Sequence, residues 1–133
     1  MKFAAFDIDG TLIRWQLYHS MVQSLATSGK LGKKAEEQLD AARMKWKRRE
    51  SSEEFREYEL VVLKIYEDAL HTLQPAEFDK HIDAVIEEFK DQVYVYTKNL
   101  IKKLKHENYL LFAISGSHLE LVERIARYYG FDD

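Results

Sequence analysis

Hydrophobic positions follow two different patterns along this chain. Short and nearly continuous apolar runs occupy residues 3–6 and 109–114, and each is followed directly by small or acidic polar residues. Runs of this kind predict strands buried on both faces, as in a parallel sheet. Between them, apolar residues recur mostly at helical spacing. The pattern therefore predicts an α/β fold whose two strands are separated by a large helical insertion.

The insertion is predicted to contain about four helices between residues 15 and 90. Ser51 and Glu54 have the spacing of a capping box that opens the third helix, and Pro75 suits the first turn of the fourth. The predicted inward-facing positions are Leu17, Met21, Val22 and Leu25 in the first helix, Leu39, Ala42, Met44 and Trp46 in the second, Phe55, Tyr58, Val62, Ile65 and Tyr66 in the third, and Phe78, Ile82, Val85, Ile86 and Phe89 in the fourth.

Two further helices flank the second predicted strand. An amphipathic segment over residues 97–106 precedes it and ends before Asn108. After the strand, Ser117 and Glu120 have capping-box spacing, and Gly130 suits the end of the helix that they would open. The two ends of the chain therefore combine strands with helices, whereas the middle of the chain is helical throughout.

The size of the insertion predicts two domains. The two strands are about a hundred residues apart, whereas an ordinary crossover between parallel strands needs roughly a dozen plus its turns. We expect residues 1–14 and 97–133 to form a Rossmann-like parallel-sheet core, incomplete within this chain, and residues 15–96 to form a helical cap. A cap above the strand ends would exclude water from a site there.

Composition narrows the class of protein. The 133 residues include 46% hydrophobic residues, carry a net charge of −3 and contain no cysteine. This composition favours a folded protein without disulfides or thiolate metal sites, and it does not suggest nucleic-acid binding. No apolar stretch approaches the ~20 residues of a membrane span, and the short apolar run before Asp7 lacks the form of a signal peptide. We therefore expect a cytoplasmic protein with no membrane or nucleic-acid partner.

The first strand ends in two acids, Asp7 and Asp9, followed by Gly10. Pulling an uncompensated carboxylate away from water costs on the order of 3 kcal/mol or more, so a cation or strong hydrogen-bond donors are implied. Side chains alternate between the two sides of an extended segment, so Asp7 and Asp9, which are two residues apart, begin on the same side. Gly10 then permits a sharp turn. The pair is thus predicted at the C-terminal end of a strand, where open α/β sheets bind ligands.

The second strand ends in Ser115-Gly116-Ser117. A hydroxyl and free backbone N–H groups at the start of a helix can hold an anion. Carboxylates and an anion site at neighbouring strand ends are compatible if Mg²⁺ bridges a carboxylate and a phosphate oxygen. Together they predict phosphoryl transfer with an aspartate nucleophile.

These residues resemble a known family. The sequence FDIDGTL at residues 6–12 is similar to the first signature of the haloacid dehalogenase superfamily, and AISGS at residues 113–117 is similar to its second. The helical insertion resembles the C1-type cap of the branch that includes phosphoserine phosphatases. In order and spacing the resemblance covers essentially the whole chain.

The resemblance implies a Mg²⁺-dependent phosphatase that acts on a small phosphorylated metabolite. Asp7 would be the nucleophile and a Mg²⁺ ligand. Asp9 would act as general acid and then base, with its backbone carbonyl on Mg²⁺. Ser115 and the Gly116 N–H would bind the transferring phosphoryl group. Thr11 would belong to the substrate-binding residues and would steady the loop and Asp9.

Two signatures of the family have no counterpart here. Its downstream lysine and its last acidic cluster cannot be placed before Asp133, and Gln16 stands where phosphoserine phosphatases carry a glutamate. We therefore expect an N-terminal portion of a longer protein, with the remaining core strands supplied from elsewhere, or an oligomer. Two other functions stay open: a non-catalytic binding or regulatory module, and a phosphotransferase or mutase of the same chemistry.

Overall fold

The computed structural model describes all residues, 1–133, as two strands and six helices. It divides into two compact units, one formed by Met1–Tyr18 with Ile82–Asp133 and the other by His19–His81. We call them the strand unit and the helical unit. The elements in chain order are β1 (Phe3–Asp7), α1 (Leu17–Thr27), α2 (Lys33–Arg48), α3 (Glu54–Thr72), α4 (Pro75–Phe89), α5 (Val95–His106), β2 (Leu110–Ile114) and α6 (Leu119–Tyr129).

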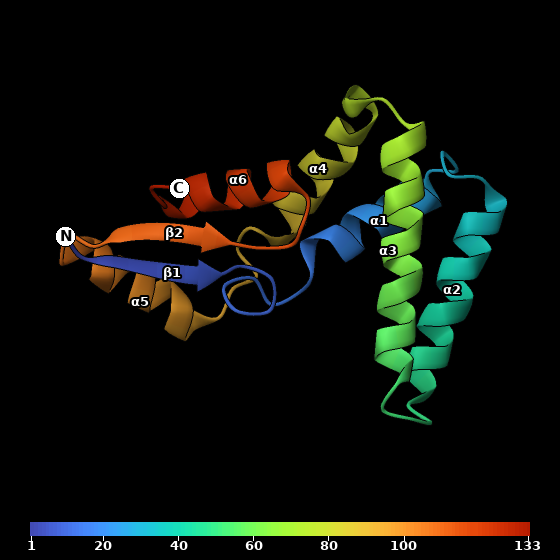
Figure 1. Ribbon diagram of the computed structural model, residues 1–133, viewed down its shortest axis with the longest axis horizontal. Helices are drawn as coiled ribbons and strands as arrows, with labels where there is room; N and C mark the ends of the chain where they lie inside the picture. The colour runs from blue at the N-terminus through green and yellow to red at the C-terminus, as the bar shows by residue number, and fades with distance from the viewer. The chain divides into compact units, whose positions relative to one another are not determined.

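In the strand unit, β1 and β2 pair in parallel, with Phe3 opposite Leu110 and Asp7 opposite Ile114. Helix α5 precedes β2 and helix α6 follows it, and both flank the strand pair (Figure 1). The predicted α/β fold with a helical insertion is confirmed. Because the strands are parallel and in this register, Asp7 and the residues after Ile114 come to the same edge of the sheet.

The prediction that both strands are buried on both faces is wrong. Phe6 and Leu111 are buried, but Phe3 is 66% exposed and Ile114 is 62% exposed. Exposure alternates along the paired strands, because Phe6 and Leu111 belong to one face of the sheet while Phe3, Leu110 and Ile114 belong to the other. The helices therefore cover one face, and the other face is open to solvent. The outer edge of β2 is partly paired, because Asp132 N donates to Leu111 O at 2.8 Å.

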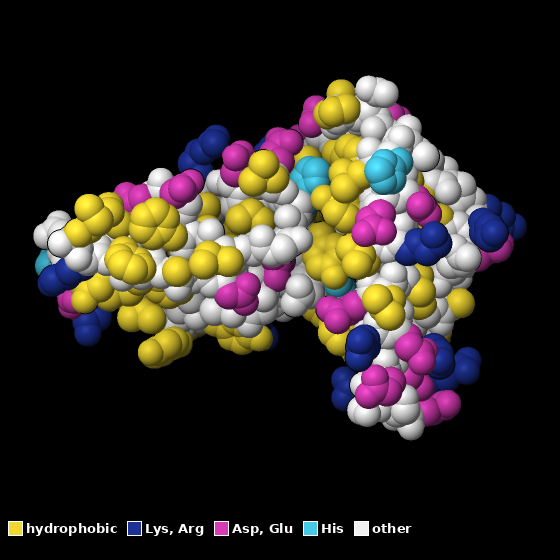
Figure 2. Space-filling view, viewed as in Figure 1, with side chains coloured by type: hydrophobic (Ala, Val, Ile, Leu, Met, Phe, Trp, Pro, Cys, Tyr) yellow, Lys and Arg dark blue, Asp and Glu magenta, His cyan; other side chains and the backbone are white.

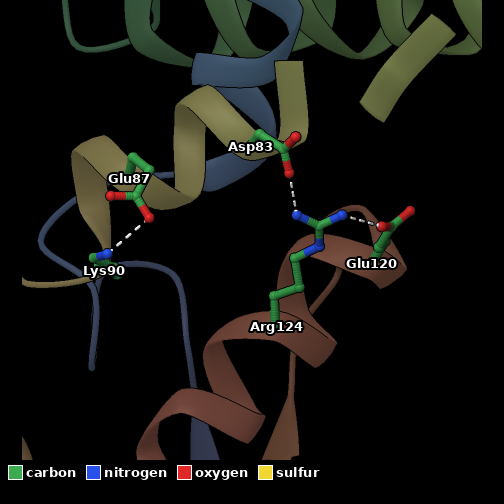
Figure 3. A network of polar contacts seen from close by, with 5 residues as sticks. All are labelled: Asp83, Glu87, Lys90, Glu120 and Arg124. Atoms are coloured by element: carbon green, nitrogen blue, oxygen red, sulfur yellow. Dashed lines mark hydrogen bonds and ion pairs between the residues drawn. The ribbon is translucent and has the colours of Figure 1, made fainter. Parts of the chain in front are cut away.

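One ion pair joins helices α4 and α6 within the strand unit. Arg124 on α6 donates to Asp83 on α4 and, at 2.6 Å, to Glu120 one turn earlier on its own helix (Figure 3). Lys90 pairs with Glu87 near the end of α4 at 2.7 Å. These contacts lie at the surface, so they orient the helices while contributing little to stability.

In the helical unit, α2 and α3 lie side by side as an antiparallel pair (Figure 1). The inward-facing positions predicted for these two helices are largely confirmed, since Leu39, Tyr58, Val62 and Ile65 are all buried. Met44 is wrong as a packing position because it is 52% exposed. It follows Leu39 by five residues, which places it about 140° around the helix from the buried face.

Both predicted capping boxes are wrong. Helix α3 starts after Glu53 and α6 starts after His118, and neither of these residues makes a side-chain cap hydrogen bond. The Glu54 carboxylate instead accepts from Glu50 N at 3.0 Å. Ser51 and Ser117 lie before these N-cap positions, so they do not serve as caps.

Other helix ends agree better with the pattern. Pro75 is the first residue of α4, and the Glu77 carboxylate accepts from Gln74 N at 2.8 Å. Gly130 ends α6 in the left-handed region, with φ of 74°. Helix α5 begins at Val95, two residues before the predicted start. No helix in the structure combines the length and apolar character needed to cross a membrane.

Candidate active site

The loop after β1 is closed by its own backbone. Ile8 O accepts from Leu12 N at 3.0 Å and from Ile13 N at 2.9 Å, and Gly10 N donates to Ile13 O at 2.8 Å. Gly10 has φ of 79°, in the left-handed region that a side chain disfavours. Ile8, Leu12 and Ile13 are fully buried, so apolar packing anchors a loop whose polar residues face outward.

A second segment, residues 92–97, supports this loop from outside. Arg14 N donates to Gln92 O at 2.8 Å, and Tyr94 N donates to Leu12 O at 3.0 Å. The buried Thr97 hydroxyl donates to the Thr11 carbonyl at 2.8 Å. Thr97 stands in the first turn of α5, and no sequence motif singled it out.

Asp7 is the last residue of β1 and is exposed. Its Oδ2 accepts a hydrogen bond from the Thr11 hydroxyl at 2.6 Å. This contact fixes the carboxylate on the loop without burying it, so one face of the group remains open to solvent. The Thr11 hydroxyl therefore holds Asp7, whereas the resemblance implied that it steadies the loop and Asp9.

Asp9 is half-buried and receives two hydrogen bonds of 2.6 Å. Its Oδ1 accepts from the backbone N–H of Leu17, the first residue of α1, and its Oδ2 accepts from the Ser115 hydroxyl. The first bond satisfies a donor that the start of a helix leaves unpaired. The second joins the two candidate motifs, which are 106 residues apart in the chain.

Burial raises the pKa of the Asp9 carboxyl above its usual range, and the nearby Asp7 charge adds to the increase. The hydrogen bonds from Ser115 and Leu17 act in the opposite direction, because they stabilise the charged form. A carboxyl whose pKa is raised in this way holds a proton more readily near neutral pH. That property suits a group which first donates a proton and then accepts one.

The segment after β2 supplies several small polar groups. Ser117 N donates to the Ser115 hydroxyl at 3.0 Å, and Gly116 is exposed. The Ser117 hydroxyl oxygen is itself buried without a hydrogen-bond partner. Burial lowers the pKa of His118 beside this segment, although the Glu120 charge opposes the shift.

The donor set at the strand ends fits Mg²⁺. The Asp7 carboxylate and the Asp9 backbone carbonyl are hard oxygen ligands, and Mg²⁺ commonly takes one or two carboxylates while water and phosphate complete its shell. No group of three or more histidine, cysteine or acidic residues gathers anywhere in the structure. The residues present are therefore compatible with a magnesium ion shared with a phosphate, not with an all-protein cage.

A surface groove runs along the start of α6, and its lining residues are His118, Leu119, Glu120, Glu123, Arg124 and Arg127. None of the three residues that the hydrogen bonds bring together, Asp7, Asp9 and Ser115, lines it. The candidate chemistry therefore lies at the exposed strand ends and not in this groove.

Comparisons with known proteins agree with the fold. A family model of haloacid dehalogenase-like hydrolases matches residues 4–133. A crystal structure of a protein of unknown function from Bordetella pertussis Tohama I is similar, with a TM-score of 0.66 at 19% sequence identity. The alignment covers 98% of this chain and 57% of that one, so the chain spans little more than half of its neighbour's length. Identity this low shows the fold alone. No curated protein matches the chain.

Proposed function

Because this chain belongs to the haloacid dehalogenase-like hydrolases, we propose that it hydrolyses a small phosphomonoester through an aspartyl-phosphate on Asp7. The observation that supports this proposal most is the 2.6 Å hydrogen bond between Ser115 and Asp9. It puts the hydroxyl of one motif on the carboxylate of the other, at the sheet edge where Asp7 is exposed. One phosphoryl group could then contact all three side chains.

The first step would be attack by Asp7 on phosphorus. Thr11 holds Oδ2, which leaves Oδ1 as the attacking atom. The bond between phosphorus and the ester oxygen breaks, its electron pair stays on that oxygen, and the protonated Asp9 carboxyl supplies the proton. The raised pKa of Asp9 favours the protonated form that this step needs.

The second step would release phosphate. Asp9, now a carboxylate, takes a proton from a water molecule whose oxygen attacks phosphorus, and the bond to Asp7 breaks with its electron pair returning to the carboxylate. Ser115 would turn its hydroxyl from Asp9 to a phosphoryl oxygen, beside the Gly116 N–H. Mg²⁺ held by the Asp7 carboxylate and the Asp9 carbonyl would offset the negative charge of the phosphoryl oxygens.

The helical unit would act as the cap of this site, and the substrate would be a small phosphorylated metabolite in the cytoplasm. The family's lysine and last acidic cluster have no counterpart among residues 1–133. In a longer protein, these residues would help to stabilise the charge that develops at Asp7. The proposed activity is therefore that of the whole protein, which would include them. The metabolite's identity would depend on residues of the helical unit.

Phosphate release from an aryl phosphate tests the proposal. Activity should require Mg²⁺ and should fall at least ~1,000-fold in Asp7→Asn, the loss typical of a missing nucleophile. Asp40→Asn makes the same chemical change at an exposed position on α2 and should stay within about twofold of wild type. Full activity in Asp7→Asn would exclude Asp7 as nucleophile.

The same assay separates the other functions. Transfer of labelled phosphate from Asp7 to an added alcohol, without release to water, would identify a phosphotransferase or mutase. Binding of a phosphate analogue such as beryllium fluoride at Asp7, without turnover of any ester, would identify a non-catalytic module.

A further inference from the structure

Helix α3 carries a second apolar face, away from the one that packs inside the helical unit. Leu60, Leu63 and Leu70 are 58%, 42% and 47% exposed, and steps of three and seven residues place them along one side of the helix. Hydrophobic side chains lie among charged ones over α3 in Figure 2. Single exposed leucines are ordinary, but three aligned on one helix form a continuous stripe.

Two opposite charges bracket Leu60 and Leu63 of this stripe, and Leu70 lies beyond them. Arg56 and Glu67 are both exposed and lie eleven residues apart, which is close to three full turns of an α-helix. They therefore fall on the same line along α3, about 16 Å apart, with Leu60 and Leu63 between them. The ion pairs of α3 use other residues, namely Glu57, Lys64 and Asp68.

The four positions share a centre. Arg56 and Glu67 are equally far from the point between Val61 and Val62, and so are Leu60 and Leu63. A twofold axis through that point, perpendicular to the helix, sets a second α3 antiparallel to the first. Arg56 then lies level with Glu67 of the partner subunit, and Leu60 lies level with Leu63 of the partner subunit. The segment from Arg56 to Glu67 is therefore complementary, in charge and in apolar contact, to the same segment of a second copy related by this twofold axis.

We infer that this face of α3 is a homodimer interface, occupied by the same face of a second copy of the chain. Two ion pairs between Arg56 and Glu67 of opposite subunits enclose a small leucine core. Charges placed symmetrically about the leucines are needed only where the same face supplies both sides of the contact. Binding to a different protein does not depend on that symmetry. A single helix face buries less than the ~800 Å² per partner of a standard interface, so the dimer is weak and reversible.

Charge exchange tests the pairing. Sedimentation equilibrium of the wild-type protein should show a monomer–dimer equilibrium below about 0.5 mM. Arg56→Glu creates two like-charge contacts and should weaken association at least ~10-fold, and Glu67→Arg should do the same. The double variant Arg56→Glu/Glu67→Arg restores both opposite-charge pairs and should return to within about threefold of wild type.

Two further variants complete the design. Lys34→Glu makes the same charge change at an exposed position on α2 and should leave association unchanged. Leu63→Ser should abolish the dimer, with helix content checked by circular dichroism. A monomer at every concentration up to about 0.5 mM would overturn the inference, and so would a dimer that survives Arg56→Glu or a double variant no better than the singles. None of these results depends on phosphatase activity.

Discussion

The loops that follow β1 and β2 form one edge of the strand unit, which we call the loop edge. This loop edge and the interior of the helical unit are stabilised by different kinds of contact. At the loop edge, single polar contacts join residues far apart in the chain, 106 residues for Ser115 with Asp9 and 86 for Thr97 with Thr11. The helical unit is held mainly by aligned apolar side chains and by rings such as Trp46, stacked on Tyr58 with centroids 5.2 Å apart. Hydrogen bonds define where atoms lie, and apolar packing mainly supplies free energy.

This difference predicts two kinds of mutational effect. A change at the loop edge should alter phosphate release more than the free energy of unfolding, because it moves or removes a reacting group. A change inside the helical unit should lower the free energy of unfolding first. The predictions below test that contrast, beginning with the largest effect.

Asp9→Asn should reduce phosphate release ~100- to 10,000-fold, because the variant has no carboxyl to donate or accept the proton. Its amide can still accept from Leu17 N and can donate to the Ser115 hydroxyl, so the free energy of unfolding should change by less than about 1 kcal/mol. Steady-state kinetics and urea unfolding measure the two quantities. Activity near wild type would exclude Asp9 as acid and base, and a loss of stability comparable to a core substitution would remove the contrast.

Sequence reasoning found the features that depend on local spacing. The apolar stripes predicted every helix, and the two strands with their polar ends were visible because the sequence changes abruptly from apolar to polar residues at Asp7 and at Ser115. Gly10 was readable too, since a sharp turn after a strand favours glycine. Each of these signals is carried by residues within a few positions of one another.

What sequence reasoning missed depends on distant parts of the chain. The support that Thr97 gives to Thr11 arises only when α5 is placed beside the loop. Ser117 looked like a cap, but the helix begins later, and Glu120 bonds Arg124 instead. The exposed face of β1 could not be anticipated from an apolar run, because the run alone does not show whether both of its faces are covered.

Leu39→Ala should lower the free energy of unfolding by about 3 kcal/mol, the usual cost of a cavity at a fully buried leucine. Met44→Ala is the matched control on the same helix, and it should cost less than about 0.5 kcal/mol because Met44 is exposed. Urea unfolding measures both. Equal costs would mean that the packing faces of α2 are wrongly assigned.

Acid should destabilise the helical unit through His19. Burial lowers the pKa of His19 to about 4, so its 3.9 Å contact with Glu59 is not an ion pair at neutral pH. The unfolded chain binds the proton near pH 6.5, so stability is complete above that pH and falls as pH drops towards 4. The loss should reach about 2–3 kcal/mol.

Unfolding curves at several pH values measure this slope. His19→Phe keeps the ring among Phe55 and Tyr58 but removes the titrating group, so most of the slope should disappear. A smaller slope should remain, because burial also lowers the pKa values of His81 and His118. His71→Gln, at an exposed position, should keep the wild-type slope. An unchanged slope in His19→Phe would mean that titrating groups other than His19 cause the acid sensitivity.

Thr97→Val should give the smallest effect on stability and the sharpest test of the contrast. The substitution keeps the shape of the buried side chain but removes the donor to Thr11 O, at a cost of about 1 kcal/mol. Thr72→Val removes a comparable hydroxyl from α3, where it donates to Asp68 O at an exposed position, and should cost less. Since Thr11 also holds Asp7, Thr97→Val should slow phosphate release several-fold while Thr72→Val leaves it unchanged. Equal effects of the two variants on both measurements would mean that the loop edge is no more sensitive to a single hydrogen bond than the surface of a helix.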